Sequence, residues 1–202
     1  MNASLPTRSP SDGLATQASR VVGAFVATFL LLGACWAVEV ANYADDGALS
    51  DKYGIQAHDG NTLWHIFTAP FLHANIDHIT ANSMPLAVFG FLAALRGVAR
   101  FVTVSLIIMV ASGLGVWFLS SPDTVTVGAS GLIFGYFGYL IARGFVEHRP
   151  FDIVVALVIA AFYGTIIFGA LPGQPGISWQ AHMFGLIGGI LAAWFTRQRS
   201  AA

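Results

Sequence analysis

Residues 21–41 have the sequence VVGAFVATFLLLGACWAVEVA, an apolar run interrupted only by Glu39. A helix of about 20 residues spans the roughly 30 Å hydrocarbon core of a bilayer. The run is longer than the apolar part of a cleaved signal peptide, and 20 mainly polar residues precede it in place of a short basic stub. We therefore expect residues 21–41 to form a retained transmembrane helix behind a disordered tail, residues 1–20.

Five further apolar runs of membrane-spanning length, or nearly so, follow this first one. They are residues 78–95, 101–119, 130–146, 151–171 and 179–196. Composition agrees with lipid as the solvent, because the chain is 56% hydrophobic and only 9% charged, against roughly 25% charged residues in a soluble domain. We expect an all-α membrane protein, a bundle of six transmembrane helices over residues 21–196, followed by a short tail, residues 197–202.

Charged residues predict how this bundle lies in the membrane. Eight of the nine basic residues fall in the two tails or in the turns after the second and fourth helices, and only Lys52 falls in the loop at 42–77. The positive-inside rule then places both termini in the cytoplasm, and the short chain favours a bacterial inner membrane. The long loop is expected to lie partly in the interface, with His65 interfacial or solvated. A net charge of −1 offers no basic surface for nucleic acid.

Four of the polar residues inside the apolar runs stand out, because an unpaired polar group is costly there: His78, Asn82, Ser130 and His182. Counted from the arginines at the inner ends, at about 1.5 Å per residue, the last three share one level about 10 Å below the outer surface. A serine needs a base to become a nucleophile, and histidine can serve at neutral pH. Amide donors and a helix N-terminus can stabilise the oxyanion that develops.

Glycines provide the means for these helices to meet. Ser130 lies in the turn Gly128-Ala129-Ser130-Gly131, and glycine permits a sharp turn beside a substrate backbone. Two small-x-x-x-small faces follow, Gly131 with Gly135 and Gly185 with Gly189, and such faces allow close helix packing. We expect this packing to bring His182 to Ser130.

Three motifs resemble those of rhomboid intramembrane serine proteases: HANIDHITAN at 73–82, GASG at 128–131 and AHMFGLIGG at 181–189. The resemblance implies a catalytic dyad of Ser130 and His182 that needs no cofactor or metal, and substrates that are transmembrane proteins in the lipid bilayer. It also implies an oxyanion hole made by His78, Asn82 and the Ser130 amide. The resemblance places Phe134 beneath the ring of His182. It also gives a supporting role in the site to four glycines: Gly128, Gly131, Gly185 and Gly189. Trp64-His65 departs from the family's usual Trp-Arg, and the familiar acidic residue near the end of the second helix is absent.

Other interpretations of the same residues remain. Ser130 could be a small residue at a helix start, His182 a structural hydrogen-bonding residue, and His78 with Asn82 a tie between helices. His73 is expected to be structural. At the level of the whole protein, the alternatives are a catalytically silent rhomboid-like protein that binds membrane clients, and a small transporter. Zinc peptidase chemistry is disfavoured because the sequence lacks HExxH. The oligomeric state is left open.

Overall fold

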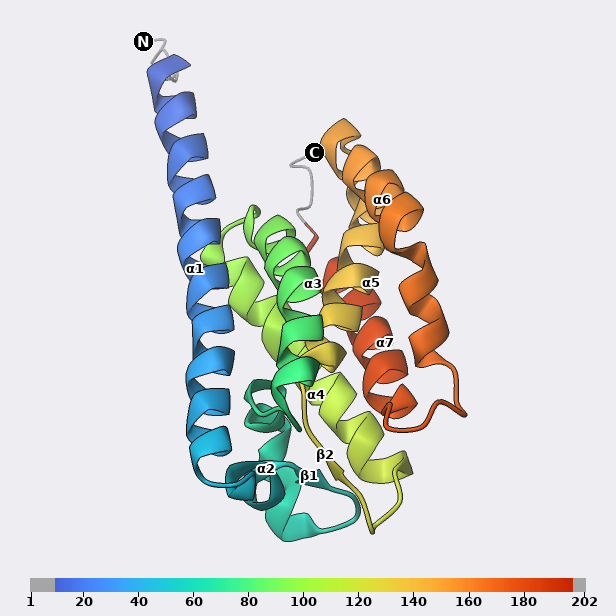
Figure 1. Cartoon of the computed structure of the whole chain (residues 1–202). Coiled ribbons are helices and arrows are strands. Elements are labelled where there is room, and N and C mark those ends of the chain that lie inside the picture. Colours follow the sequence, from blue (N-terminus) through green and yellow to red (C-terminus); the bar gives the residue numbers. More distant parts are fainter. Residues whose placement is uncertain (1–9, 198–202) are drawn as a thin grey trace, which may run out of the picture.

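The computed structural model describes residues 10–197, which form a helical bundle with a small folded loop region at one end (Figure 1). The long helices are α1 (Pro10–Ala44), α3 (Ile76–Ala94), α4 (Val98–Leu119), α5 (Ser130–Glu147), α6 (Pro150–Tyr163) and α7 (Trp179–Phe195). The shorter elements are α2 (Ala48–Tyr53), strands β1 (Ile55–Gln56) and β2 (Val125–Thr126), and the 3-10 segments η1 (Gly60–Phe67), η2 (Ala69–Phe71) and η3 (Gly164–Ala170).

Each apolar run of the sequence coincides with one long helix, and two boundaries differ from the prediction. Helix α1 begins at Pro10, so residues 10–20 are helical, while residues 1–9 and 198–202 lie outside the described part. Helix α6 ends at Tyr163 and the chain continues as the 3-10 segment η3, where glycine favours neither helix nor strand. Three stretches are long and apolar enough to cross a membrane by themselves: 13–44, 98–119 and 150–170.

Helix α5 forms the centre of the bundle. Its residues from Gly131 to Leu140 are all buried, and α3, α4, α6 and α7 all pack against it. The contact with α7 is backbone to backbone: a Cβ added to Gly185 would lie 2.3 Å from the Gly131 carbonyl oxygen, and one added to Gly189 only 1.8 Å from that of Gly135. The predicted close approach of α5 and α7 is confirmed for Gly185 and Gly189, whereas side chains at Gly131 and Gly135 would point to Ser112 and Ile108 of α4.

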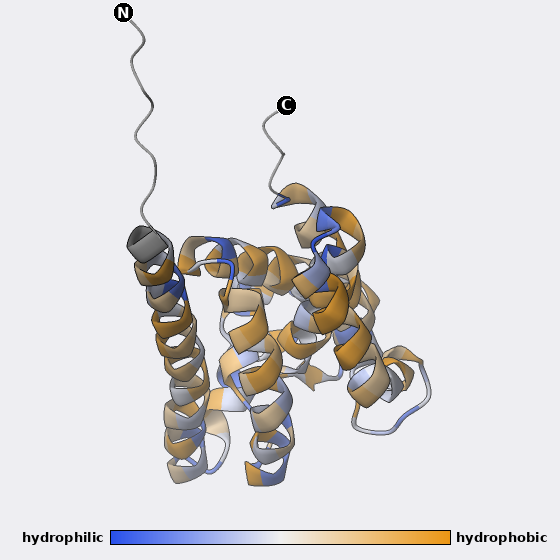
Figure 2. Ribbon diagram, turned by 90° about the horizontal axis from the view of Figure 1, so that it is seen from above, coloured by the Kyte–Doolittle hydropathy of each residue, from blue (hydrophilic) through white to orange (hydrophobic). Residues whose placement is uncertain are grey.

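The outward faces of the helices remain apolar. In Figure 2 the apolar colours run around the helices and are not confined to one side. Large side chains such as Phe29, Phe162 and Trp194 are more than half exposed, an arrangement that water penalises and lipid does not. The chain is thus built as an integral membrane protein.

Buried ion pairs tie the helix ends that lie on the same side as the chain termini. Asp152, the third residue of α6, is completely buried and pairs with Arg96, just beyond α3, and with Arg143 of α5, whose Nε lies 3.0 Å from the Asp152 carboxylate. Arg100 of α4 pairs with Glu147 at the end of α5. Several of the arginines that indicate the inner side are therefore inside the protein, and they hold four helices together.

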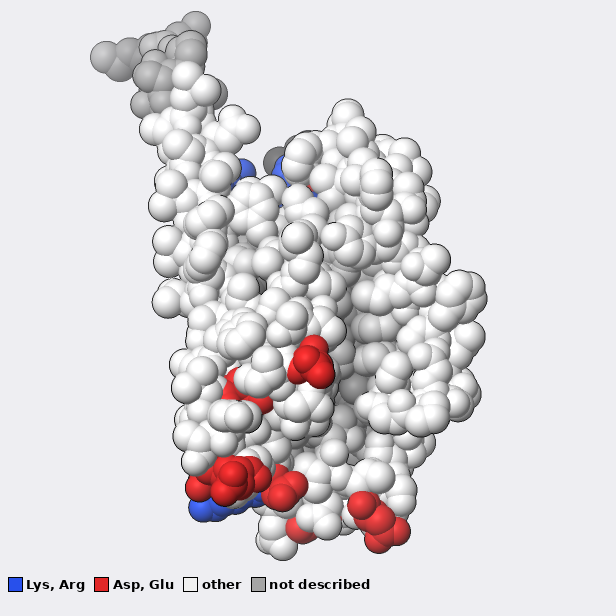
Figure 3. All heavy atoms as spheres, in the orientation of Figure 1, with Lys and Arg blue, Asp and Glu red and all other residues white. Residues whose placement is uncertain are grey.

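At the opposite end, the segment between α1 and α3 is folded against the rest of the chain. Strand β1 pairs antiparallel with β2, with Ile55 opposite Thr126. The expectation for His65 was wrong, because the side chain is buried and its ring bonds the Gly54 carbonyl at 2.8 Å. Acidic residues gather at this end, at the bottom of Figure 3, away from the start of α1 at the top of Figure 1.

Candidate active site

The turn before α5 is the centre of the predicted site. Gly128 has φ +123°, which L side chains rarely adopt, and its N–H donates to the Ala69 carbonyl at 2.9 Å. Ser130 is the first residue of α5, and the N-cap is Ala129, which has no side-chain hydrogen bond to offer. Since the Ser130 hydroxyl makes no capping bond, the ordinary role of a serine at a helix start does not account for it.

His78 and Asn82 of α3 face this turn. A Cβ added to Gly128 would lie 2.7 Å from His78 Cε1 and 3.8 Å from Asn82 Nδ2. The Asn82 amide nitrogen is buried, yet within the described chain it has no hydrogen-bond partner. His78 Nδ1 accepts a hydrogen bond from the Ala74 N–H at 3.5 Å, which assigns the ring proton to Nε2. Two N–H donors therefore lie beside Gly128 with capacity to spare.

His182 lies on α7 with its ring fixed on two sides. The ring stacks on Phe134 with centroids 4.0 Å apart and planes 11° from parallel, the arrangement that the resemblance implies. Its Nδ1–H donates to the Gly169 carbonyl at 2.8 Å. With the proton on Nδ1, Nε2 carries a free lone pair, which is the form that a general base requires.

The residues flanking Ser130 and His182 are in contact across the helices. Gly131 lies against the backbone of Gly185, and the Ser112 hydroxyl of α4 donates to the Ala181 carbonyl at 2.9 Å. Among the hydrogen bonds of residues 10–197, none joins Ser130 to His182; such catalytic bonds often tighten only when substrate is present. The fold thus places His78 and Asn82 beside the turn that leads into Ser130, and His182 on the helix that packs against α5.

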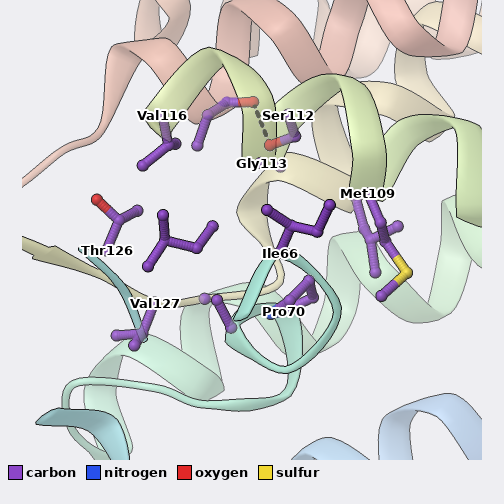
Figure 4. Close-up of a pocket in the computed structure, with 14 residues that line it drawn as sticks. Ile66, Pro70, Met109, Ser112, Gly113, Val116, Thr126 and Val127 are labelled. Carbon is purple, nitrogen blue, oxygen red and sulfur yellow. Dashed lines mark hydrogen bonds between the residues drawn. The ribbon is translucent and has the colours of Figure 1, made fainter. Parts of the chain in front are cut away.

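A small cavity lies behind this turn, between α4, η1 and the segment from β2 to Gly131 (Figure 4). Its volume is about 20 Å³, and most of its lining is apolar, including Ile66, Val116 and Val127. Figure 4 shows the Ser112 hydroxyl turned toward its hydrogen-bond acceptor. The cavity is too small for a side chain of substrate, so it belongs to the packing of the turn.

Two residues at the site were not predicted to have these contacts. Gly169 supplies the carbonyl that orients His182, and nothing in the sequence of η3 indicated it. His73, in the loop before α3, is completely buried, and its Nε2 accepts a hydrogen bond from the Ala129 N–H at 3.4 Å. Burial, then repulsion by His78, lowers the pKa of His73 to about 4, although the Phe71 carbonyl opposes this. The position of His73 at the start of the motif HANIDHITAN was the only feature of the sequence that could have indicated a contact with the site.

The sequence also matches a known protein family. The family model of the Rhomboid domain matches residues 60–199, which include all three motifs. The chain belongs to the rhomboid family. The match covers α3 to α7, and hence every candidate site residue of this rhomboid.

Relatives of this rhomboid occur in bacteria and plants. An uncharacterized protein of Mycobacterium tuberculosis, Rv1337, is 40% identical over 182 residues, which are 86% of this chain and 75% of the relative. YdcA of Bacillus subtilis, named provisionally as a rhomboid protease, is 30% identical over 67% of this chain and 68% of its own length. The mitochondrial RHOMBOID-like protein 6 of Arabidopsis thaliana is 29% identical over 71% of this chain and 46% of its own length.

Proposed function

We propose that this rhomboid is an intramembrane serine endopeptidase that hydrolyses peptide bonds in or next to the transmembrane segments of other membrane proteins. The observation that carries the proposal is the state of His182. Its Nδ1 proton is committed to the Gly169 carbonyl, so Nε2 is free to accept a proton on the helix that packs against Ser130. The Ser130 hydroxyl, at the start of the helix that α7 packs against, makes no hydrogen bond to the N-terminal turn of α5, so a free base and a free hydroxyl are carried by neighbouring helices.

The chemistry follows the pattern of a serine nucleophile with a histidine base. His182 Nε2 takes the Ser130 hydroxyl proton as Oγ attacks the scissile carbonyl, forming the C–O bond of a tetrahedral intermediate. His182 then gives that proton to the leaving amine as the C–N bond breaks. Water, deprotonated by the same Nε2, hydrolyses the acyl-enzyme and releases Ser130. The Gly169 carbonyl stabilises the doubly protonated ring in each step, the part that a carboxylate plays in a triad.

Charge that develops on the substrate oxygen needs donors that are free before the reaction. The unpartnered Asn82 amide, His78 Nε2–H and the Ser130 amide at the start of α5 are three such donors around Gly128. Donors arranged in advance need no reorganisation in the transition state, and one of them is typically worth about 100-fold in rate. Glycine at 128 leaves room for the substrate carbonyl among them.

The proposal includes the placement of the protein in the membrane. All six long helices cross the bilayer, with both termini in the cytoplasm of a bacterial cell, and the site opens toward the outer face. Substrate enters laterally near α3 and α6, and the segment at 171–178, rich in glycine and proline, acts as a cap over His182. The loop between α1 and α3 lies in the outer interface. Transmembrane proteins are the substrates, with small residues at the cleavage point.

The direct test compares purified wild type with Ser130→Ala and His182→Ala in liposomes that contain a transmembrane substrate. Both variants should lose cleavage, and a fluorophosphonate probe should label wild type at Ser130 but not Ser130→Ala. Ser105→Ala is a matched control, because it removes a serine hydroxyl from α4 whose hydrogen bonds go to the Phe101 carbonyl and the Tyr136 hydroxyl, away from the proposed nucleophile and base. Full cleavage activity in either Ser130→Ala or His182→Ala would refute the mechanism.

A silent client-binding protein is the remaining alternative, and the unpartnered Asn82 amide argues against it. A buried donor without a partner costs about 1–3 kcal/mol, and a protein that only binds helices gains nothing from keeping it. Absence of fluorophosphonate labelling in well-folded wild type, with retained binding of a transmembrane helix, would establish that alternative. A transporter would instead show flux across liposomes that survives Ser130→Ala.

A further inference from the structure

The turn that carries Ser130 is held from outside its own helix. Two successive N–H groups point away from α5, one to η2 and the other to the segment that joins η2 to α3. Gly128 N–H donates to the Ala69 carbonyl at 2.9 Å, and Ala129 N–H donates to His73 Nε2 at 3.4 Å. The first bond uses backbone alone, whereas the second depends on one side chain. Since the next N–H is that of Ser130, these bonds set the direction in which the Ser130 amide points.

His73 is itself anchored, through its backbone, to α1 and the start of α2. Its carbonyl oxygen accepts one hydrogen bond from the Asn42 side chain at 3.1 Å and another from the Ser50 hydroxyl at 2.9 Å. Asn42 also accepts the Ser50 N–H at 3.0 Å and is buried, as are Ser50 and His73. The ring therefore projects from a fixed point, which is what a side chain needs if it is to position something else.

The form of the ring suits this contact. An acceptor at Nε2 requires a neutral imidazole with its proton on Nδ1. Complete burial favours the neutral ring, as does His78, whose ring lies 5.1 Å away at 72°; the lowered pKa of His73 expresses both effects. The ring therefore stays an acceptor at any pH at which the protein would work. His78 in turn presents its own Nε2–H beside Gly128. At the same turn, His73 therefore offers a hydrogen-bond acceptor and His78 a hydrogen-bond donor.

We propose that His73 is a positioning residue, which fixes the Ala129 peptide through its Nε2 and thereby aims the Ser130 amide and hydroxyl at the reacting carbonyl. The proposal rests on the proposed protease function. His73 does not touch substrate, and it acts through the turn. Its carbonyl oxygen bonds side chains of α1 and α2, and its ring nitrogen bonds the turn before Ser130. His73 thus links to the nucleophile two helices that carry no candidate catalytic residue.

The test compares His73→Leu, which fills the space but removes the acceptor, with His73→Gln, whose amide oxygen can accept the Ala129 N–H. His65→Leu is the matched control, since it also removes a buried histidine whose ring bonds the backbone, in this case the Gly54 carbonyl, at a site away from the turn. Cleavage of a transmembrane substrate gives kcat and KM per active site, with active sites counted by fluorophosphonate labelling. Hydrogen–deuterium exchange follows the peptide that spans Gly128 to Ser130.

His73→Leu should lower kcat by ~10- to 100-fold with little change in KM, because a displaced nucleophile slows chemistry more than binding. It should also speed exchange at Ala129. His73→Gln should recover most of the wild-type kcat and most of the protection from exchange at Ala129. His65→Leu should lose thermal stability yet keep the wild-type kcat per labelled site. A wild-type kcat per labelled site in His73→Leu, or a His73→Gln variant as slow as His73→Leu, would overturn the proposal.

Failure of the protease function gives a different result from failure of the positioning role. If folded wild type neither cleaves nor labels, the proposed function fails, and with it the kinetic consequence assigned to His73. The contact itself is then judged by exchange alone: faster exchange at Ala129 in His73→Leu, restored by His73→Gln, upholds it. Unchanged exchange in both variants refutes the contact whatever the activity.

Discussion

A single methyl group at Gly189 would test whether the contact between α5 and α7 sets the geometry of the site. In Gly189→Ala the new Cβ would lie 1.8 Å from the Gly135 carbonyl oxygen, 2.6 Å from its carbon and 2.9 Å from the Tyr139 nitrogen. All three are backbone atoms of α5, so no side chain can rotate out of the way. To reach the 3.4 Å at which ordinary contact begins, α7 must move away from α5 by about 1.6 Å at this level.

This displacement would reach His182, because the two residues lie seven positions apart on one helix, or about 10 Å along its axis. A misplacement of about 1 Å can cost about 100-fold in rate, so we expect at least that loss in cleavage and in fluorophosphonate labelling. Overpacking should also destabilise the bundle by about 1–3 kcal/mol, reduced by up to about 1 kcal/mol through the better helix propensity of alanine.

The matched control is Gly33→Ala on α1, where a Cβ would meet nothing within 4 Å. This variant should keep wild-type cleavage and be equally stable or slightly more stable, because it gains propensity without a clash. Thermal unfolding followed by circular dichroism, and labelling rates in the same detergent, provide the two measurements. Wild-type stability and labelling in Gly189→Ala would refute the backbone contact. Lost stability with an unchanged labelling rate would refute its role in the site.

Two further predictions concern buried charge. Asp152→Asn should lower the free energy of unfolding by about 3–5 kcal/mol, because it leaves two arginines beside a neutral amide; unfolding in mixed micelles measures this, and the exposed Asp123→Asn should stay within about 0.5 kcal/mol of wild type. The second follows from the pKa of His73, which folding lowers from 6.5 to about 4. Between these two pH values the unfolded chain binds a proton at His73 and the folded chain does not. The free energy of unfolding should therefore fall as pH drops through this window, by at most about 3 kcal/mol. His73→Gln should flatten that slope, and an unchanged slope would show that His73 is not its source.

The positions of the helices could be predicted because the signals were local. Apolar runs gave the helix limits to within a few residues from α3 to α5 and for α7, and the glycine spacing predicted which faces of α5 and α7 meet. The start of α1 and the change from α6 to η3 were missed. Polar residues before an apolar run do not prevent a helix, and the last turns of an apolar helix can tighten to 3-10 without changing composition.

The partners of individual polar groups could not be predicted, because each pair is far apart in the chain. Nothing in the sequence pairs Asp152 with Arg96, which lies 56 residues earlier, or assigns the Gly169 carbonyl to His182. The arginines near the helix ends were interpreted only as charges that mark the inner side, and nothing in the sequence indicated that Arg143 is completely buried. Charge counts identify a side of the membrane, whereas burial depends on packing that no single segment contains.

Two different kinds of contact position Ser130 and His182, the candidate dyad: one sets the distance between their helices and the other sets the direction of the reacting groups. The distance between the backbones that carry Ser130 and His182 depends on glycine, because at Gly185 and Gly189 only hydrogen atoms fit between α7 and the backbone of α5. The direction of the reacting groups depends on residues from other elements. The Gly169 carbonyl of η3 orients the imidazole, and the segment from Ala69 to His73 orients the turn before Ser130. Substitutions in the first group should separate the two reacting atoms, whereas substitutions in the second should turn them out of line while the helices stay packed.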